Sequence, residues 1–208
     1  MTKNLKIKVC GMRDPQNVKE LSLLDIDYVG FIFHEKSKRN VNGIEVLPIE
    51  TSDKKRVGVF VNKAVDFIEE KIRIHKLNAV QLHGDETPRF CKALYDEGVD
   101  VIKVFSIDDD FDFSITKEYE DVVNYFLFDT KGHARGGNGV VFDWSLLEKY
   151  EGNIPFILSG GLSLQSLEEL KQLEHEMLFG IDLNSRFEIE PALKNIELLK
   201  TFIHELRN

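Results

Sequence analysis

The stretch Tyr125-Phe126-Leu127-Phe128-Asp129-Thr130-Lys131 decides how the rest of the chain is interpreted. Four apolar or aromatic residues lead into one carboxylate, and the glycine-rich run Gly136-Gly137-Asn138-Gly139 follows shortly afterwards. The pattern predicts a buried parallel strand that carries Asp129 to its carboxyl end, with residues 132–139 as a candidate lid. An aspartate that only begins a turn has the same local pattern. The role of Asp129 therefore depends on what the other strands bring to the same place.

Seven other segments have strand character, because they are short, apolar and bounded by turn residues. They cover residues 5–9, 28–33, 56–61, 79–82, 99–105, 155–159 and 177–183. Helical or potentially helical segments alternate with them. These cover residues 14–24, 43–50, 64–75, 88–97, 117–123, 163–173 and 191–206, with one more beginning at Asp143-Trp144. Asp14-Pro15, Ser163 and Pro191 are the expected helix starts, whereas Pro48 interrupts the pattern of 43–50.

Eight strands that alternate with helices predict a parallel sheet covered by helices. We expect a single α/β domain over residues 1–208, closed into a (β/α)8 TIM barrel. The alternative is an open doubly wound sheet. That fold usually carries G-x-G-x-x-G after its first strand, where this chain has Cys10-Gly11-Met12-Arg13.

Composition narrows the classes of function. The apolar content of 42% and the charged content of 30% are ordinary for a soluble globular protein. A net charge of −9 without a basic run argues against a nucleic-acid partner. The amino-terminal residues lack the apolar core of a signal peptide, and no apolar run reaches membrane length. With Cys10 and Cys91 as expected free thiols, we predict a cytoplasmic protein without a membrane partner.

Active residues of a barrel lie at the carboxyl ends of its strands. Cys10, Arg39 and Asp129 lie at or after such ends, and a purely structural set would hardly combine a thiol, a guanidinium and a carboxylate. Each has a simpler reading, since cysteine is often a small buried hydrophobe and a loop arginine is usually solvated. The rigid fork of Arg39 would also suit a carboxylate on a substrate.

A phosphate site is expected after the last two strands, where barrels commonly hold one. Gly160-Gly161 would let backbone N–H groups approach an oxyanion, and Asp182 and Ser185 lie around the end of the final strand. Alone, the glycine pair would be a plain turn. His83 has no partner visible in the sequence, so packing or a loop hydrogen bond is expected for it. The histidines show no metal-ligand spacing, and no metal site is predicted.

Taken in order, these motifs resemble the phosphoribosylanthranilate isomerase family of the tryptophan pathway over essentially the full length. The matching stretches are residues 8–12, 30–33, 37–39, 56–60, 80–86, 128–130, 136–139, 142–144, 159–162 and 180–182. The resemblance implies a (β/α)8 barrel that needs no cofactor. It also implies isomerisation of N-(5-phosphoribosyl)anthranilate to 1-(2-carboxyphenylamino)-1-deoxyribulose 5-phosphate by an Amadori rearrangement, the third step from chorismate to tryptophan.

The resemblance also implies roles for individual residues. Cys10 is expected to be the general base and Asp129 the general acid, with Arg39 on the anthranilate carboxylate. Gly160, Gly161 and Ser185 would belong to the phosphate cradle. We also expect Asp182, at the end of the last strand, to bind the substrate. A protonated Asp129 would supply the ring oxygen with a proton, and the adjacent Phe126 and Phe128 would favour that form by burial. A partly ionised Cys10 would remove the C2 proton.

This chain departs from the family pattern in two loops. Lys38 stands where a proline commonly precedes Arg39, and residues 184–195 lack the family's glycines, with Arg186 as a candidate replacement phosphate partner. Two other functions remain open. One is a related phosphoribosyl-amine isomerase, such as the histidine-pathway enzyme, which would carry an aspartate in place of Cys10. The other is a non-catalytic phosphate-binding barrel. The expected partner is the small phosphoribosyl substrate, and the chain is expected to be a monomer or a homodimer.

Overall fold

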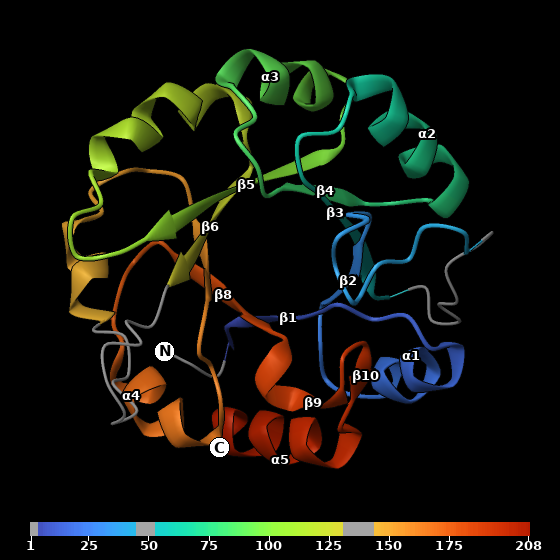
Figure 1. Ribbon diagram of the computed structural model, residues 1–208. Helices are drawn as coiled ribbons and strands as arrows, with labels where there is room; N and C mark the ends of the chain where they lie inside the picture. Colours follow the sequence, from blue (N-terminus) through green and yellow to red (C-terminus); the bar gives the residue numbers. More distant parts are fainter. Residues whose placement is uncertain (1–3, 45–52, 131–143) are drawn as a thin grey trace.

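The structure, a computed structural model, describes residues 4–44, 53–130 and 144–208. Eight parallel strands form a closed barrel in the order β1 to β8, and helices surround it (Figure 1). The strands are β1 (Lys6–Cys10), β2 (Tyr28–Ile32), β3 (Lys55–Phe60), β4 (Ala79–Leu82), β5 (Asp100–Ile107), β6 (Tyr125–Thr130), β7 (Phe156–Ser159) and β8 (Leu178–Leu183). The prediction of a (β/α)8 barrel is confirmed, and the open-sheet alternative is wrong because β1 pairs with β8.

Among the described residues, the covering layer contains five α-helices and several 3₁₀ segments. The α-helices are α1 (Pro15–Ser22), α2 (Val65–His75), α3 (Pro88–Asp96), α4 (Leu167–Gln172) and α5 (Ile196–Arg207). The 3₁₀ segments are η2 (Phe113–Val122), η3 (Trp144–Lys149), η4 (Leu164–Ser166) and η5 (Ser185–Phe187). Segments predicted as helix at 117–123 and from Trp144 are therefore 3₁₀ turns. Short helical segments around the barrel are consistent with the length of this chain, which is close to the minimum for this fold.

Two of the expected helix starts are confirmed by their caps. Asp14 accepts a hydrogen bond from the Asn17 backbone N–H at 2.8 Å, and Pro15 is the first helical residue. Ser163 begins η4 with a capping box that includes Ser166. The helix predicted within 43–50 falls largely on 45–52, outside the described residues.

The predicted start of the last helix at Pro191 is wrong. A short antiparallel pair, β9 (Glu188–Glu190) and β10 (Leu193–Lys194), occupies this region. Helix α5 begins only at Ile196, where the Asn195 side chain accepts from the Leu198 N–H at 3.0 Å. Proline is compatible with a first helical position, but it is equally compatible with the hairpin turn seen here.

The core has two parts, which follow from the alternation of side chains along each strand. Inward residues form a compact cluster in the barrel: Tyr28, Val57, Ala79, Ile102, Val104, Leu127 and Ile157. Outward residues, including Phe60, Phe126 and Phe156, pack between the strands and the helices. The inward cluster fills the barrel toward the amino ends of the strands. The polar inward residues nearer the carboxyl ends therefore remain available to form a site.

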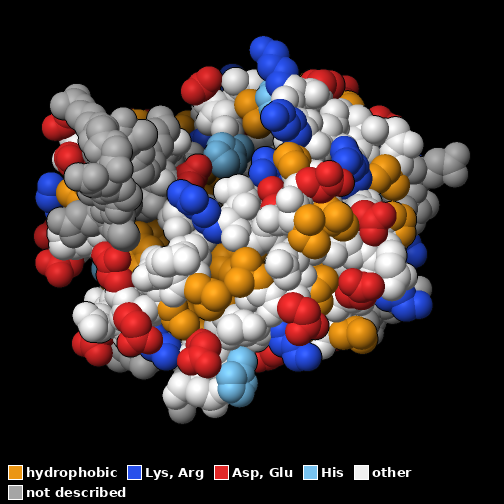
Figure 2. All heavy atoms as spheres, turned by 60° about the horizontal axis from the view of Figure 1, so that its bottom comes forward, with side chains coloured by type: hydrophobic (Ala, Val, Ile, Leu, Met, Phe, Trp, Pro, Cys, Tyr) orange, Lys and Arg blue, Asp and Glu red, His pale blue; other side chains and the backbone are white. Residues whose placement is uncertain are grey.

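Figure 2 shows hydrophobic side chains gathered on the face that carries α5. Leu23 and Ile189 are 79% and 68% exposed, and both line a groove between α1 and the β9–β10 region. None of the described helices is long and apolar enough to cross a membrane.

Candidate active site

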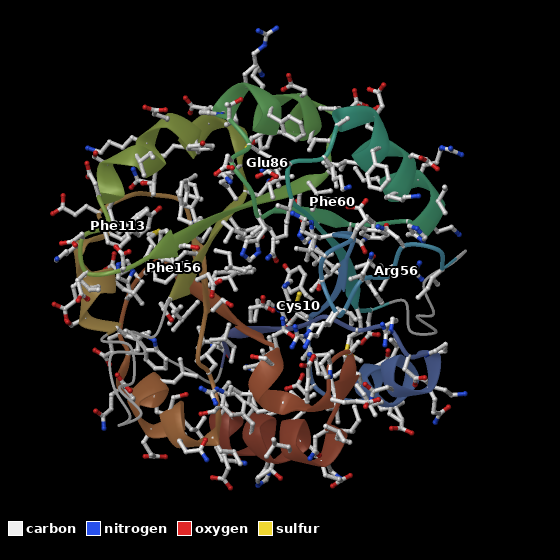
Figure 3. The ribbon with its side chains drawn as sticks, viewed as in Figure 1. Cys10, Arg56, Phe60, Glu86, Phe113 and Phe156 are labelled. Carbon is white, nitrogen blue, oxygen red and sulfur yellow. The ribbon has the colours of Figure 1, made fainter. Side chains whose placement is uncertain are left out.

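A cavity of about 220 Å³ lies at the carboxyl ends of the barrel strands. Its lining comes from the ends of β1, β2, β3, β4, β6, β7 and β8 and from the loops that follow β4, β7 and β8. The lining residues are Cys10, Ile32, Val59, Gln81, His83, Asp129, Ser159, Gly160, Gly161, Leu162, Asp182, Asn184, Ser185 and Arg186. Figure 3 shows Cys10 close to the barrel axis, whereas Phe113 lies near the outer rim.

Most of the predicted site residues converge on this cavity. Cys10, Asp129, Gly160, Gly161, Asp182 and Ser185 all line it, together with the candidate phosphate partner Arg186. They come from widely separated parts of the sequence and meet because all parallel strands end at one rim. Arg39 is not among the lining residues. The predicted lid at 132–139 lies outside the described residues.

Strand register places four inward polar residues side by side. Asp129 on β6 is paired with Ser159 on β7, Ser159 with Asp182 on β8, and Asp182 with Lys8 on β1. Cys10 lies two residues beyond Lys8 on the same strand, and therefore on the same face. The thiol and the Asp129 carboxyl thus project into one space from strands separated by β7 and β8.

Lys8 is the main cation facing Cys10 inside the barrel. Its side chain is 1% exposed, and its Nζ lies 2.9 Å from Asp182 Oδ2. Burial opposes the charge on Lys8, but the neighbouring Asp182 and Cys10 outweigh it and raise the pKa of Lys8 above its usual value. The ammonium group therefore stays charged, and Asp182 keeps its other oxygen, Oδ1, without a hydrogen-bond partner among the described residues.

Burial raises the pKa of the Cys10 thiol above its ordinary value, although Lys8 and Lys194 act in the opposite direction. The surroundings of Cys10 therefore disfavour the partly ionised thiol that we expected. Gly30 lies directly beside it on β2, and a Cβ at Gly30 would come within 2.8 Å of the Cys10 Sγ. The sulfur consequently occupies space that only a glycine leaves free. Cys91, buried in α3, fits the expected small hydrophobe.

The surroundings of Asp129 differ from the prediction in one respect. Phe126 and Phe128 point outward into the helix-facing core, on the other face of β6 from Asp129. They do not bury the carboxyl, whose side chain is 32% exposed. Among the described residues, the imidazole of His83 lies close to it, with 3.7 Å between Nε2 and Asp129 Oδ2. The expectation of packing or a loop contact for His83 missed this neighbour.

The glycine pair after β7 has a backbone conformation that favours glycine. Gly160 and Gly161 have φ angles of +94° and +67°, in the left-handed region that favours glycine. A Cβ at Gly160 would collide with the backbone and hydroxyl of Thr130, whereas one at Gly161 would meet open space. Backbone N–H groups can approach an anion closely here because no side chain intervenes.

Arg39 is held by Glu188 through two hydrogen bonds. The distances are 2.8 Å from Nε to Oε1 and 2.5 Å from Nη2 to Oε2. Lys194 lies on the other side of Glu188, with its Nζ 2.6 Å from Oε1 and 2.8 Å from the Asn184 side-chain oxygen. Although burial opposes ionisation, hydrogen bonds from Arg39 and Lys194 lower the pKa of Glu188 to about 2. This network joins the loop after β2 to the cavity wall at Asn184.

Four residues that shape the site were not singled out from the sequence: Lys8, Gln81, Glu188 and Lys194. A signal existed for Lys8, since Lys8 and Cys10 share one face of a strand expected to be buried on both sides. Gln81 precedes His83 by two residues and shares its face in the same way. The Glu188–Lys194 contact depends on a hairpin that the sequence did not predict. Among the described residues, no group of three His, Cys, Asp or Glu side chains could hold a metal ion.

Comparisons with known proteins bear on this arrangement. Residues 7–205 match the family model described as N-(5'phosphoribosyl)anthranilate (PRA) isomerase. A curated N-(5'-phosphoribosyl)anthranilate isomerase from Parabacteroides distasonis is 47% identical, over 96% of this chain and 92% of that protein.

Two solved structures share the fold at TM-scores of 0.81, each over 98% of both chains. One is a phosphoribosyl anthranilate isomerase, 28% identical, in complex with reduced 1-(o-carboxyphenylamino)-1-deoxyribulose 5-phosphate. The other, 30% identical, is described as mutually generated monomers of the dimeric phosphoribosylanthranilate isomerase from Thermotoga maritima.

Proposed function

The chain belongs to the N-(5'-phosphoribosyl)anthranilate isomerase family of tryptophan biosynthesis, and we propose that Cys10 and Asp129 carry the isomerisation in it. The substrate is N-(5-phosphoribosyl)anthranilate, and the product is 1-(2-carboxyphenylamino)-1-deoxyribulose 5-phosphate. The observation that carries these roles is that a thiol and a carboxyl group line one cavity together with a left-handed glycine pair.

Asp129 acts first in the proposed reaction, as the general acid. It gives a proton to the ring oxygen of the ribose, so that the ring opens and a positively charged imine forms at C1. Cys10, as the thiolate, then removes the proton from C2. The imine nitrogen accepts the electron pair, and the enolamine rearranges to the ketose. Burial raises the pKa of the Cys10 thiol, and the Lys8 ammonium beside it acts in the opposite direction, so Lys8 is the group that favours the thiolate.

The substrate is held at its two charged ends. Gly160, Gly161 and Ser185 take the phosphate through backbone and hydroxyl donors, with Arg186 at the cavity rim as an additional cation. Asp182 offers Oδ1 to a sugar hydroxyl. Arg39 takes the anthranilate carboxylate through its Nη1 group, because its two hydrogen bonds to Glu188 use Nε and Nη2. The oligomeric state stays a prediction of monomer or homodimer.

Substitution of each reacting group tests the assignment. Cys10→Ala and Asp129→Asn should each lower kcat by roughly 10²- to 10⁴-fold in the anthranilate fluorescence assay, while circular dichroism stays unchanged. Cys91→Ala is the matched control, because Cys91 is buried in α3 away from the cavity. Near-normal turnover in either site variant would overturn the roles. Activity only on the histidine-pathway phosphoribosyl amine, or ligand binding without turnover in the native chain, would favour the two other functions.

A further inference from the structure

The cavity contains an imidazole that the proposed reaction does not use. His83 follows β4 directly, and its Nε2 lies 3.7 Å from Oδ2 of Asp129. Both side chains line the cavity and are about one-third exposed, at 36% and 32%. The separation exceeds that of a hydrogen bond, but catalytic contacts of this kind commonly tighten when substrate binds.

Gln81 contacts the other ring nitrogen of His83, Nδ1. Gln81 is 2% exposed, and its Nε2 lies 3.2 Å from His83 Nδ1. When the Gln81 N–H donates to Nδ1, that nitrogen is the acceptor, and the hydrogen of the neutral ring is on Nε2. The Nε2–H group is then the one nearest to Asp129.

The Gln81 amide also has a second orientation. Its Oε1 is buried without a hydrogen-bond partner among the described residues. With the amide turned over, Oε1 would accept from the Nδ1–H of a protonated imidazole, which also carries a hydrogen on Nε2. Gln81 can therefore hold His83 as a donor toward Asp129 in the neutral and in the charged form.

The backbone that carries His83 is held on both sides. The His83 N–H donates to the carbonyl of Phe60 at 2.8 Å. The next residue, Gly84, donates its N–H to Glu86 at 2.9 Å and accepts from Lys103 Nζ at 2.6 Å. Glu86 and Lys103 are themselves a buried ion pair at 3.2 Å. The imidazole thus projects from a loop whose position is set by buried charges, as a positioning group requires.

We propose that His83 is a positioning residue that holds the Asp129 carboxyl for proton donation, an inference that rests on the proposed function. Donation from Nε2–H to Oδ2 orients the carboxyl and leaves Oδ1 to carry the proton that goes to the ring oxygen. The same contact stabilises the carboxylate that remains after the transfer, because a hydrogen bond to an ionised acceptor is stronger. Asp129 then regains its proton from solvent, and Cys10 releases the one taken from C2, so the proton count balances.

The test compares His83→Ala with His83→Gln, whose amide N–H reaches a similar position. His83→Ala should lower kcat roughly 10- to 100-fold with KM changed less than threefold, and His83→Gln should recover most of that loss. His204→Gln is the matched control, since His204 lies on α5 outside the cavity. Urea unfolding midpoints of all variants should agree. If His83→Ala fails to fold, His83→Asn replaces it as the variant with a shortened donor.

A double-mutant cycle separates this inference from the proposed function. In an Asp129→Asn background, measured at high enzyme concentration, His83→Ala should cause no further loss, because its only effect passes through Asp129. A kcat for His83→Ala within twofold of wild type would overturn the inference. So would an equal loss in both backgrounds, or a His83→Gln variant as slow as His83→Ala. Near-normal turnover of Asp129→Asn alone would instead overturn the acid role of Asp129.

Discussion

Lys8 and Asp182 form a buried ion pair at the seam where β1 closes the barrel against β8, with 2.9 Å between Nζ and Oδ2. Cys10 is the next residue after Lys8 on the same face of β1. In the strand register, only Ser159 separates Asp182 from Asp129. The pair therefore combines two tasks, since it closes the barrel and places a positive charge beside the proposed base. Four consequences of the site geometry can be measured.

Lys8→Met should destabilise the fold, because it leaves the Asp182 carboxylate buried without its partner. We expect a loss of about 3–5 kcal/mol in the free energy of unfolding, measured by urea denaturation. Lys6→Met is the matched control on the same face of β1. Its partner Asp27 is partly exposed, and Lys6 is 48% exposed, so the expected loss is below about 1 kcal/mol. Equal stability of Lys8→Met and wild type would contradict the importance of the pair.

Alkylation of Cys10 by iodoacetamide should report its raised pKa. In a Cys91→Ser background, the rate should keep rising with pH beyond 9.0, the ordinary thiol value, because burial disfavours the thiolate. Lys8→Met should make the reaction slower at every pH, since it removes the cation that opposes this effect. A rate that already levels off near neutral pH would show that the free enzyme holds Cys10 as a thiolate.

Glu188→Gln should change the response of stability to acid. The pKa of Glu188 is lowered to about 2 in the folded chain, from an ordinary value of 4.5. Its contribution is therefore fully present above pH 4.5 and is lost as pH falls toward 2. We expect wild type to lose about 1–3 kcal/mol more than Glu188→Gln over this window, in urea titrations at fixed pH values. Parallel curves for the two proteins would contradict the shift. Glu188→Gln should also raise KM if Arg39 binds the anthranilate carboxylate.

Gly160→Ala and Gly161→Ala form a matched pair. Both positions have positive φ angles, so each alanine should cost about 1 kcal/mol from the backbone alone. Only at Gly160 does the new methyl group collide with Thr130. Gly160→Ala should therefore be the less stable variant and should show the larger rise in KM. A larger effect at Gly161 on stability would contradict the geometry of this loop.

Much of the fold could be predicted because the relevant signals are local. Runs such as Ala79–Leu82 and caps such as Asp14 act through neighbouring residues, and both matched the structure. The last helix could not be placed from Pro191, because the hairpin before α5 is stabilised by contacts with distant residues. Asn17, for example, accepts from the Lys194 N–H at 2.7 Å across 177 positions.

The sequence could predict which residues gather at the site, but not which of them contact one another. Strand ends in a parallel barrel must meet at one rim, so Cys10, Asp129 and Gly160 could be expected together. Phe126 and Phe128 were misjudged as neighbours of the acid, because adjacent residues on a strand face opposite sides. Arg39 was expected to be available, yet its guanidinium is bonded to a glutamate 149 positions away.

By itself, the sequence determined the barrel, the family and the chemical groups at its mouth, because alternating patterns and strand-end residues are properties of short segments. The tertiary structure decided which groups face one another. The Lys8–Asp182 pair joins residues 174 positions apart, and the His83–Asp129 contact joins two strand ends. Both depend on barrel closure and strand register, which arise from the packing of the whole chain rather than from any one stretch of it.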